Sequence, residues 1–125
     1  MEDLYIEGSE TIPTITFKTD GNLKLEGRAL PENAFKLFEP MLDWAKNIEV
    51  SEINIECNLD YFNTSVSKHL FDLFKEFESN KKVEKITIKW MYEDGDDEML
   101  ESGEMFEDML TRSNFIYHKY AEVFN

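Results

Sequence analysis

Two kinds of apolar periodicity alternate along this chain of 125 residues. Segments with an apolar residue at every second position are typical of β-strands, whose successive side chains point to opposite faces. Segments with apolar residues at intervals of three and four are typical of helices with one buried stripe. The strand-like segments are residues 14–18, 23–27, 53–57, 85–92 and 115–120, and the helix-like segments are residues 31–48, 64–80 and 99–110.

This alternation predicts an α/β protein with the element order β-β-α-β-α-β-α-β. The first two strands flank Thr19-Asp20-Gly21-Asn22, and an Asp-Gly pair favours a tight turn, so we expect an antiparallel hairpin. The later strands are joined by helices, which favours parallel pairing. The result is a mixed sheet covered by helices. Because the chain has no Ser-rich or Gly-rich linker, residues 1–125 are expected to form a single domain.

Two of the helical segments contain residues that disfavour a helix. Pro40 lies inside the first one, where an interior proline costs about 3 kcal/mol, so we expect a kink or a fresh helix start there. Gly103 weakens the third helix, whose apolar positions are Met99, Phe106, Met109 and Leu110. We interpret five methionines as residues that fill the core, namely Met41, Met91, Met99, Met105 and Met109.

The charge balance narrows the classes of partner. Lys and Arg number 13, and Asp and Glu number 27, so the net charge is −14 at pH 7. A nucleic-acid backbone or an anionic membrane surface would repel such a chain. No apolar run exceeds three residues, whereas a membrane span needs about 18. We therefore expect neither a nucleic-acid partner nor a membrane partner.

The compartment is inferred from two further features. Cys57 is the only cysteine, so no internal disulfide can form, which fits a reducing compartment. The segment Met1-Glu2-Asp3 carries acids where a signal peptide would carry basic residues. A cytoplasmic location is therefore expected.

The acidic stretch from Glu93 to Asp108 is the first candidate for chemistry, because its nine carboxylates could attract Ca²⁺ or Mg²⁺. Its spacing differs from that of an EF-hand loop, in which ligands alternate and glycine occupies the sixth position. We interpret the stretch as a solvated loop followed by a helix whose N-terminus the acids stabilise. No metal site is predicted.

Cys57, His69 and His118 are the second candidate, but their scattered positions fall short of a zinc site. Cys57 alternates with Ile53 and Ile55, so we interpret it as a buried core residue. The chain also lacks the glycine-rich patterns that hold phosphates and the nucleophile elbow. We therefore predict no catalytic residue and no cofactor. The alternative is a small enzyme or nucleotide-binding domain that brings Cys57, His69 and the acidic stretch into one pocket.

The segment from Leu59 to Lys68 lies between a predicted strand and the most regular predicted helix. Asn63 is a residue type that caps helices, which places Thr64 and Ser65 in the first turn. Hydroxyls are accessible there, and the unpaired N–H groups of the turn favour a phosphoryl group. Phosphorylation would add a charge of about −1.5 to −2. The segment predicts a phosphorylation switch, and ordinary helix capping is the simpler alternative.

Two segments bear on the family of this chain: the segment from Gly27 to Trp44, with Pro31-Glu32-Asn33-Ala34 and the interior Pro40, and the segment from Leu59 to Ser65. The first is similar to the Pro-Glu-Asn-Ala motif and Pro-interrupted helix of the SiaC family of bacterial regulatory phosphoproteins, and the second resembles that family's phosphorylation loop. The early Leu4-Tyr5-Ile6 and the late Lys89-Trp90-Met91-Tyr92 fit the same pattern. The resemblance thus extends over nearly the whole chain.

The resemblance implies a fold related to the STAS domains of anti-sigma factor antagonists, with the phosphate acceptor at the start of the helix after the third strand. It implies that Thr64, supported by Asn63 and Ser65, is phosphorylated by a serine/threonine kinase of the histidine-kinase-like ATPase type. A PP2C-type phosphatase would remove the phosphate. The unphosphorylated form would bind a diguanylate cyclase and promote cyclic-di-GMP synthesis, a signal in biofilm formation. Asn63-Thr64-Ser65-Val66 stands where STAS domains usually have Asp-Ser-Ser-Gly. This departure makes control of a sigma factor the weaker implication, and it is kept as the alternative function.

The expected mechanism is a partner switch without enzymatic activity. The predicted loop from Asp60 to Ser65 and the exposed face of the next helix, including Lys68, would contact the target while Thr64 is unmodified. A phosphate would block that contact by its charge and its desolvation cost. Tyr61 and Phe62 are candidate interface aromatics, and the alternative is that they cover the sheet edge. A constitutive adaptor that is never phosphorylated is a third possible function.

Overall fold

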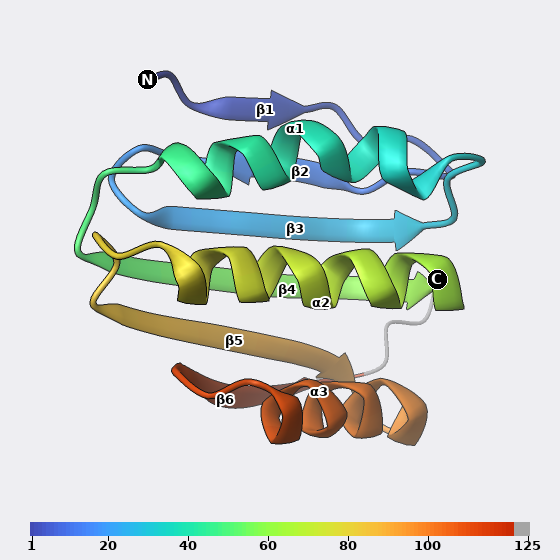
Figure 1. Ribbon diagram of the computed structural model, residues 1–125. Helices are drawn as coiled ribbons and strands as arrows, with labels where there is room; N and C mark the ends of the chain where they lie inside the picture. The colour runs from blue at the N-terminus through green and yellow to red at the C-terminus, as the bar shows by residue number, and fades with distance from the viewer. Residues whose placement is uncertain (122–125) are drawn as a thin grey trace.

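The computed structural model describes residues 1–121, which form a six-stranded sheet and three helices (Figure 1). The predicted class, α/β with a mixed sheet, is confirmed. None of the helices in these residues is long and apolar enough to cross a membrane. The elements are β1 (Leu4–Ile6), β2 (Thr14–Phe17), β3 (Asn22–Ala29), α1 (Ala34–Asn47), β4 (Glu52–Phe62), α2 (Thr64–Ser79), β5 (Lys85–Glu93), α3 (Asp97–Met109) and β6 (Ser113–Tyr120).

The strands follow one another across the sheet in the order of the sequence. β1, β2 and β3 pair antiparallel, and β3 to β6 pair in parallel through helical crossovers. The hairpin of β2 and β3 and the parallel pairing of the later strands agree with the sequence prediction. Crossovers of one hand that advance in one direction put their helices on the same face of the sheet, and Figure 1 shows α1, α2 and α3 in one layer. β1 is not predicted from the sequence, because three residues are too few to show a period.

The predicted hairpin turn joins β2 to β3. Lys18 donates its N–H to the carbonyl of Asn22 (3.1 Å), and Gly21 donates its N–H to the carbonyl of Lys18 (3.0 Å). Gly21 has a φ of +98°, a conformation that glycine adopts without strain. The carbonyl of Gly21 accepts the N–H of Asn54 (2.8 Å), so the turn is also fixed to β4.

α1 passes through Pro40 without interruption, so the expected fresh helix start does not occur. The proline deprives only the Lys36 carbonyl of its helical partner. Lys36 and Pro40 are both exposed, so water can satisfy that carbonyl. Buried side chains on both sides of the proline, including Phe38 and Met41, stabilise the helix across it.

An aromatic cluster lies between the helices and the parallel strands. Trp90 of β5 packs edge-on against Phe106 of α3, with ring centroids 5.5 Å apart. The indole N–H of Trp90 donates to the carbonyl of Met99 (2.8 Å), so this buried polar group has its partner. Gly103 of α3 faces the same indole, and a Cβ added there would lie 2.6 Å from Trp90 Cδ1. The glycine that disfavours the helix thus allows α3 to approach Trp90.

Gly103→Ala is expected to lower the free energy of unfolding by about 1 to 2 kcal/mol, because the added methyl group overlaps the fully buried indole. The overlap outweighs the gain in helix propensity, which is about 1 kcal/mol. Urea denaturation measures the change. Glu104→Ala, on the exposed side of the same helix, is the control and is expected to be neutral or slightly stabilising. A Gly103→Ala protein more stable than wild type would contradict the close contact with Trp90.

Three of the five methionines expected in the core are not buried there. Met105 and Met109 are 61% and 47% exposed, and Met91 of β5 is only partly buried, so the prediction is wrong for these three. The buried residues of this part of the chain are Met99, Gly103, Phe106 and Leu110, which follow one another at intervals of four, three and four. Residues 105 and 109 belong to the neighbouring, outer stripe of the helix.

One carboxylate ties the end of α2 to the start of β6. Glu78 is 9% exposed, and its carboxylate accepts the N–H of Thr111 (3.2 Å), the N–H of Arg112 (2.7 Å) and the hydroxyl of Ser113 (2.8 Å). The Arg112 guanidinium donates back to the carbonyl of Glu78 (2.6 and 3.0 Å). These bonds fix the turn that leads from α3 into β6.

Candidate functional site

The start of α2 has the geometry of a capped helix. Asn63 is extended (φ −90°, ψ 176°), and its side-chain oxygen accepts the N–H of Val66 (3.0 Å). Thr64 is the first residue of the helix, and both Thr64 and Ser65 are exposed. The first N–H groups of a helix have no carbonyl partner within it, so this turn favours an anion. The Thr64 hydroxyl thus lies accessible at the positive end of α2.

A cation lies one helical turn after Thr64. Lys68 is exposed, and side chains four residues apart on a helix are neighbours. Ser67, the third hydroxyl of this segment, is partly buried, and its N–H donates to the carbonyl of Asn63 (3.0 Å). Thr64 and Ser65 are therefore the more accessible hydroxyls, and a group attached to Thr64 would have Lys68 within reach.

The segment before the helix is a strand rather than the expected loop. β4 continues to Phe62, and it pairs with β3 up to this residue. The register shifts between Leu59 and Tyr61, which leaves Asp60 without a partner residue on β3. Such a β-bulge interrupts the in-and-out alternation of a strand, and Asp60 and Tyr61 are accordingly both exposed. Sequence alternation alone does not reveal this extra residue.

The two candidate aromatics of this segment have different environments. Tyr61 is 49% exposed. Phe62 is partly buried, and its ring centroid lies 6.2 Å from that of Trp90 and 6.5 Å from that of Phe106. Phe62 therefore packs with Trp90 and Phe106, and Tyr61 is the more exposed of the two aromatic side chains.

Phe35 is an exposed aromatic residue near α2 that the sequence analysis missed. It is 57% exposed in the first turn of α1, and its ring centroid lies 6.4 Å from that of His69 on α2. His69 also stacks on Phe38 of α1, with centroids 5.7 Å apart. His69 is one helical turn after Ser65, so Phe35 lies beside the first turns of α2. The signal in the sequence is an aromatic residue outside the buried stripe of its helix.

Negative charge gathers at the C-terminal ends of the neighbouring strands. Burial is the main cause that raises the pKa of Tyr120, and the charges of Asp60, Glu93 and Asp96 raise it further. These carboxylates therefore lie close to one another near the ends of β4, β5 and β6. A phosphate on Thr64, two residues after the end of β4, would add further negative charge at this end of the parallel strands.

The groups of the enzymatic alternative lie in separate environments. Cys57 is 1% exposed, and burial, with a smaller contribution from Glu56, raises the pKa of its thiol, which disfavours the nucleophilic thiolate. His69 stacks between helices, as described above. Within residues 1–121, no group of three or more His, Cys, Asp or Glu is arranged to hold a metal ion. Asp96 instead caps α3 by accepting the N–H of Met99 (3.1 Å), which is the helix-stabilising role predicted for the acidic stretch.

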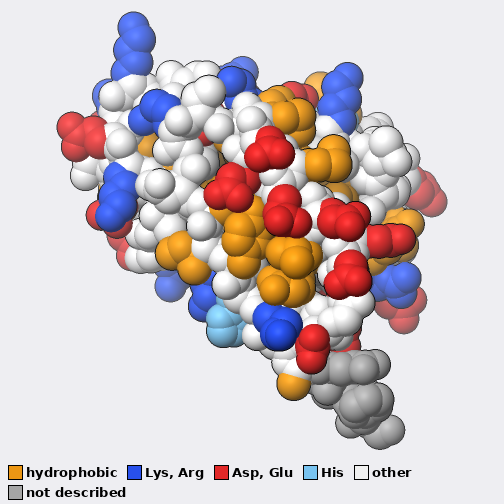
Figure 2. Space-filling model, turned by 90° about the horizontal axis from the view of Figure 1, so that it is seen from below, with side chains coloured by type: hydrophobic (Ala, Val, Ile, Leu, Met, Phe, Trp, Pro, Cys, Tyr) orange, Lys and Arg blue, Asp and Glu red, His pale blue; other side chains and the backbone are white. Residues whose placement is uncertain are grey.

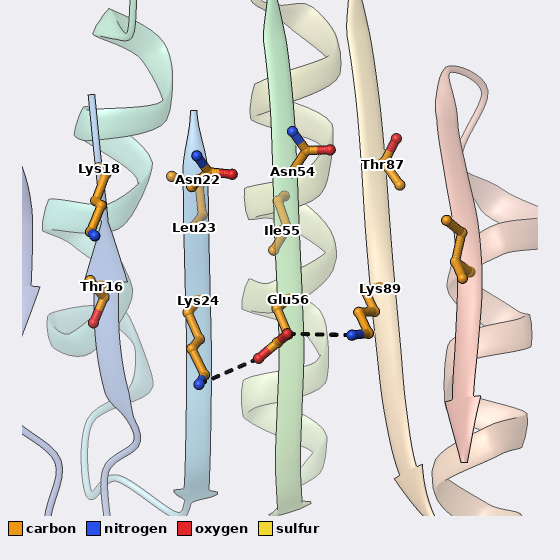
Figure 3. Close-up of a pocket in the computed structure, with 11 residues that line it drawn as sticks. Thr16, Lys18, Asn22, Leu23, Lys24, Asn54, Ile55, Glu56, Thr87 and Lys89 are labelled. Atoms are coloured by element: carbon orange, nitrogen blue, oxygen red, sulfur yellow. Dashed lines mark ion pairs between the residues drawn. The ribbon is translucent and has the colours of Figure 1, made fainter. Parts of the chain in front are cut away.

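A hollow of about 570 Å³ lies on the face of the sheet opposite the helices (Figure 3). Three of its charged side chains pair with one another across three strands. Glu56 of β4 lies between Lys24 of β3 (3.4 Å) and Lys89 of β5 (3.7 Å). Neither Cys57 nor either histidine lines this hollow.

The sequence model of SiaC family regulatory phosphoproteins matches residues 6–120. The chain belongs to the SiaC family. An uncharacterized protein of Pseudomonas aeruginosa (strain UCBPP-PA14) is 26% identical over 113 residues, which cover 86% of this chain and 90% of that protein. The resemblance to the SiaC family is thus confirmed.

Solved structures of SiaC from Pseudomonas aeruginosa have the same fold. Apo-SiaC is 26% identical, with a TM-score of 0.78 over 94% of this chain and 99% of that chain. A second SiaC structure is 25% identical, with a TM-score of 0.76 over 98% of this chain and 100% of that chain. A chain in the crystal structure of the diguanylate cyclase SiaD in complex with its activator SiaC is 24% identical, with a TM-score of 0.81 over 94% of this chain and 100% of that chain.

Proposed function

We propose that this SiaC-family protein is a non-enzymatic regulator that switches partners through reversible phosphorylation of Thr64. The observation that carries the proposal is an exposed threonine as the first residue of a capped helix. Membership in a family of regulatory phosphoproteins supports it. SiaC of Pseudomonas aeruginosa, which shares the fold, is the activator of the diguanylate cyclase SiaD. The unmodified form of this chain binds and activates a diguanylate cyclase and so acts in cyclic-di-GMP signalling in the cytoplasm.

The surface around Thr64 suits a protein partner while the threonine is unmodified. Two exposed aromatic side chains lie on the neighbouring segments, Tyr61 before α2 and Phe35 beside it. A docked partner would remove water from these rings, which stabilises the complex. It would also cover the neutral Thr64 hydroxyl, which can keep a hydrogen bond within the interface.

A phosphate at Thr64 makes binding of the partner unfavourable. Docking would strip water from a dianion at the start of the helix that follows the acidic end of β4, and burial of an uncompensated charge is costly. Lys68, one turn away, and the positive end of α2 stabilise the phosphate in the free protein. Both effects favour the dissociated state. A kinase of the histidine-kinase-like ATPase type therefore dissociates the complex by adding the phosphate, and a PP2C-type phosphatase restores it by removing the phosphate.

Phosphopeptide mapping by mass spectrometry tests the modified residue. Protein purified from its native cells, and protein incubated with ATP and such a kinase, are expected to carry the phosphate on Thr64. A PP2C phosphatase is expected to remove it, and a Thr64→Ala protein is expected to stay unlabelled. A label on Ser65 or Ser67 would move the site, and no label under any growth condition would support the constitutive adaptor.

Phe35→Ala is expected to weaken binding to the diguanylate cyclase about tenfold, because an exposed aromatic side chain beside the switch loses its contact area. Isothermal titration calorimetry measures the affinity. Tyr5→Ala is the matched control, since Tyr5 is a 64% exposed aromatic residue on β1, at the far edge of the sheet. Equal affinities of the Phe35→Ala protein and the wild type would exclude the start of α1 from the interface.

A further inference from the structure

The two edges of the sheet differ in length. β1, at one edge, has three residues, whereas β6, at the other edge, has eight. Within residues 1–121, no strand pairs with the outer side of β6. Edge strands are usually short, charged, covered or interrupted by proline, because their free backbone groups pair readily with another strand. β6 contains no proline, and its one charged side chain other than histidine, Lys119, lies near its end and pairs with Asp94 (3.9 Å).

Acidic side chains of α3 lie along this edge. The hydroxyl of Tyr117 donates to the carboxylate of Glu107 (2.8 Å), which holds that carboxylate beside β6. Burial, the hydrogen bond to Glu107 and the charges of Glu104 and Asp108 raise the pKa of Tyr117, so two further carboxylates lie near the same strand. Figure 2 views the molecule from the side of α3 and β6, and it shows acidic side chains around exposed hydrophobic ones.

The side chains of a strand added beside β6 would have different surroundings on the two faces of the sheet. Ile116 is 56% exposed and points to the face opposite the helices, while Phe115 and Tyr117 lie partly buried under α3. A strand added beside β6 would place every second side chain next to Ile116 and the alternate ones beneath the acidic side of α3. Apolar residues suit the first set, and Lys or Arg suits the second.

We propose that the outer edge of β6 binds an extended, basic segment of a partner protein, which adds a seventh strand to the sheet. A second copy of this chain is a poor occupant, because pairing β6 with β6 would bring two acidic α3 helices together. Backbone hydrogen bonds supply affinity, and the carboxylates select Lys and Arg. The edge is formed by α3 and β6, so its occupancy does not depend on phosphorylation of Thr64.

Fluorescence anisotropy with labelled peptides tests this edge. The probe is an eight-residue peptide of alternating lysine and valine, and one control replaces the lysines with glutamates. A second control carries N-methyl groups on alternate backbone nitrogens, which removes the donors of an added strand. The lysine peptide is expected to bind with a Kd below about 1 mM, and each control at least about tenfold more weakly. Equal binding of either control, or no binding of the lysine peptide, would overturn the proposal.

Charge-neutral variants locate the site on the protein. Glu104→Gln combined with Asp108→Asn is expected to weaken the lysine peptide about fivefold and to reduce its salt dependence. Both side chains are exposed, so the fold is expected to be unaffected.

The matched control is Glu39→Gln combined with Asp43→Asn, which removes two charges from α1, at the other end of the helical layer (Figure 1). Equal weakening in both double variants would mean that net charge attracts the peptide. A concentration-dependent dimer that the lysine peptide does not dissociate would assign the edge to a second copy. Either result would overturn the proposal.

Discussion

Thr64→Asp is expected to weaken binding to the diguanylate cyclase about 100-fold, which corresponds to about 2.7 kcal/mol. The substitution places a carboxylate on the exposed first residue of α2, where a docked partner would have to bury it. Folding is expected to be unaffected or slightly improved, since an acid in the first turn of a helix interacts well with the helix dipole. Calorimetric titration with the purified cyclase gives the affinity, and thermal unfolding checks the fold.

Ser79→Asp is the matched control for this variant. Ser79 is exposed and is the last residue of the same helix, so the substitution makes the same change in charge away from the switch. The Ser79→Asp protein is expected to bind the cyclase like the wild type. If Thr64→Asp and Ser79→Asp bind the cyclase equally, the charge at the start of α2 does not control docking, and the partner switch is wrong.

Glu78→Ala is expected to lower the free energy of unfolding by about 2 to 3 kcal/mol, because it removes the acceptor of four hydrogen bonds at a mostly buried turn. The donors left without it are the N–H groups of Thr111 and Arg112 and the hydroxyls of Thr111 and Ser113. Urea denaturation measures the loss. Asp72→Ala removes an exposed acid from the same helix and is expected to be nearly neutral. A Glu78→Ala protein as stable as the Asp72→Ala protein would show that the network contributes nothing.

The same carboxylate makes stability depend on pH. Burial alone would raise the pKa of Glu78, but the hydrogen bonds from Arg112, Ser113 and Thr111 outweigh burial and lower the pKa below its ordinary value of 4.5. A carboxyl whose pKa is lower in the folded state contributes stability above its unfolded pKa and loses it as the pH falls through the folded pKa. The free energy of unfolding of the wild type should therefore fall more steeply below about pH 5 than that of the Glu78→Gln protein.

The elements with a clear period could be predicted from the sequence. The hairpin around Gly21, the parallel strands and the capped start of α2 all follow from local patterns of residues, and each is present. The burial of Cys57 also follows, since it shares its alternation with Ile53 and Ile55. Local chemistry decides these features, so no knowledge of the tertiary structure is needed.

The features that sequence analysis missed depend on contacts between distant segments. The bulge at Asp60 is a mismatch with β3, which the sequence of β4 alone does not show. In the sequence Gly103 only weakens the predicted helix, and its role becomes clear from the close contact of α3 with Trp90. Phe35 acquires its place beside the switch only when α1 packs on α2. In each case the feature depends on packing against a segment that is distant in the sequence.

The sequential order of the strands has a consequence for how the polypeptide acquires its structure. Each new strand joins the edge that its predecessor has just formed, and no strand has to insert between two that are already paired. The growing polypeptide can therefore fold progressively from its first strands as it leaves the ribosome, in small steps with short loop closures. Within residues 1–121, β6 is the last strand to form in that order, and its outer edge can still accept the backbone of another strand.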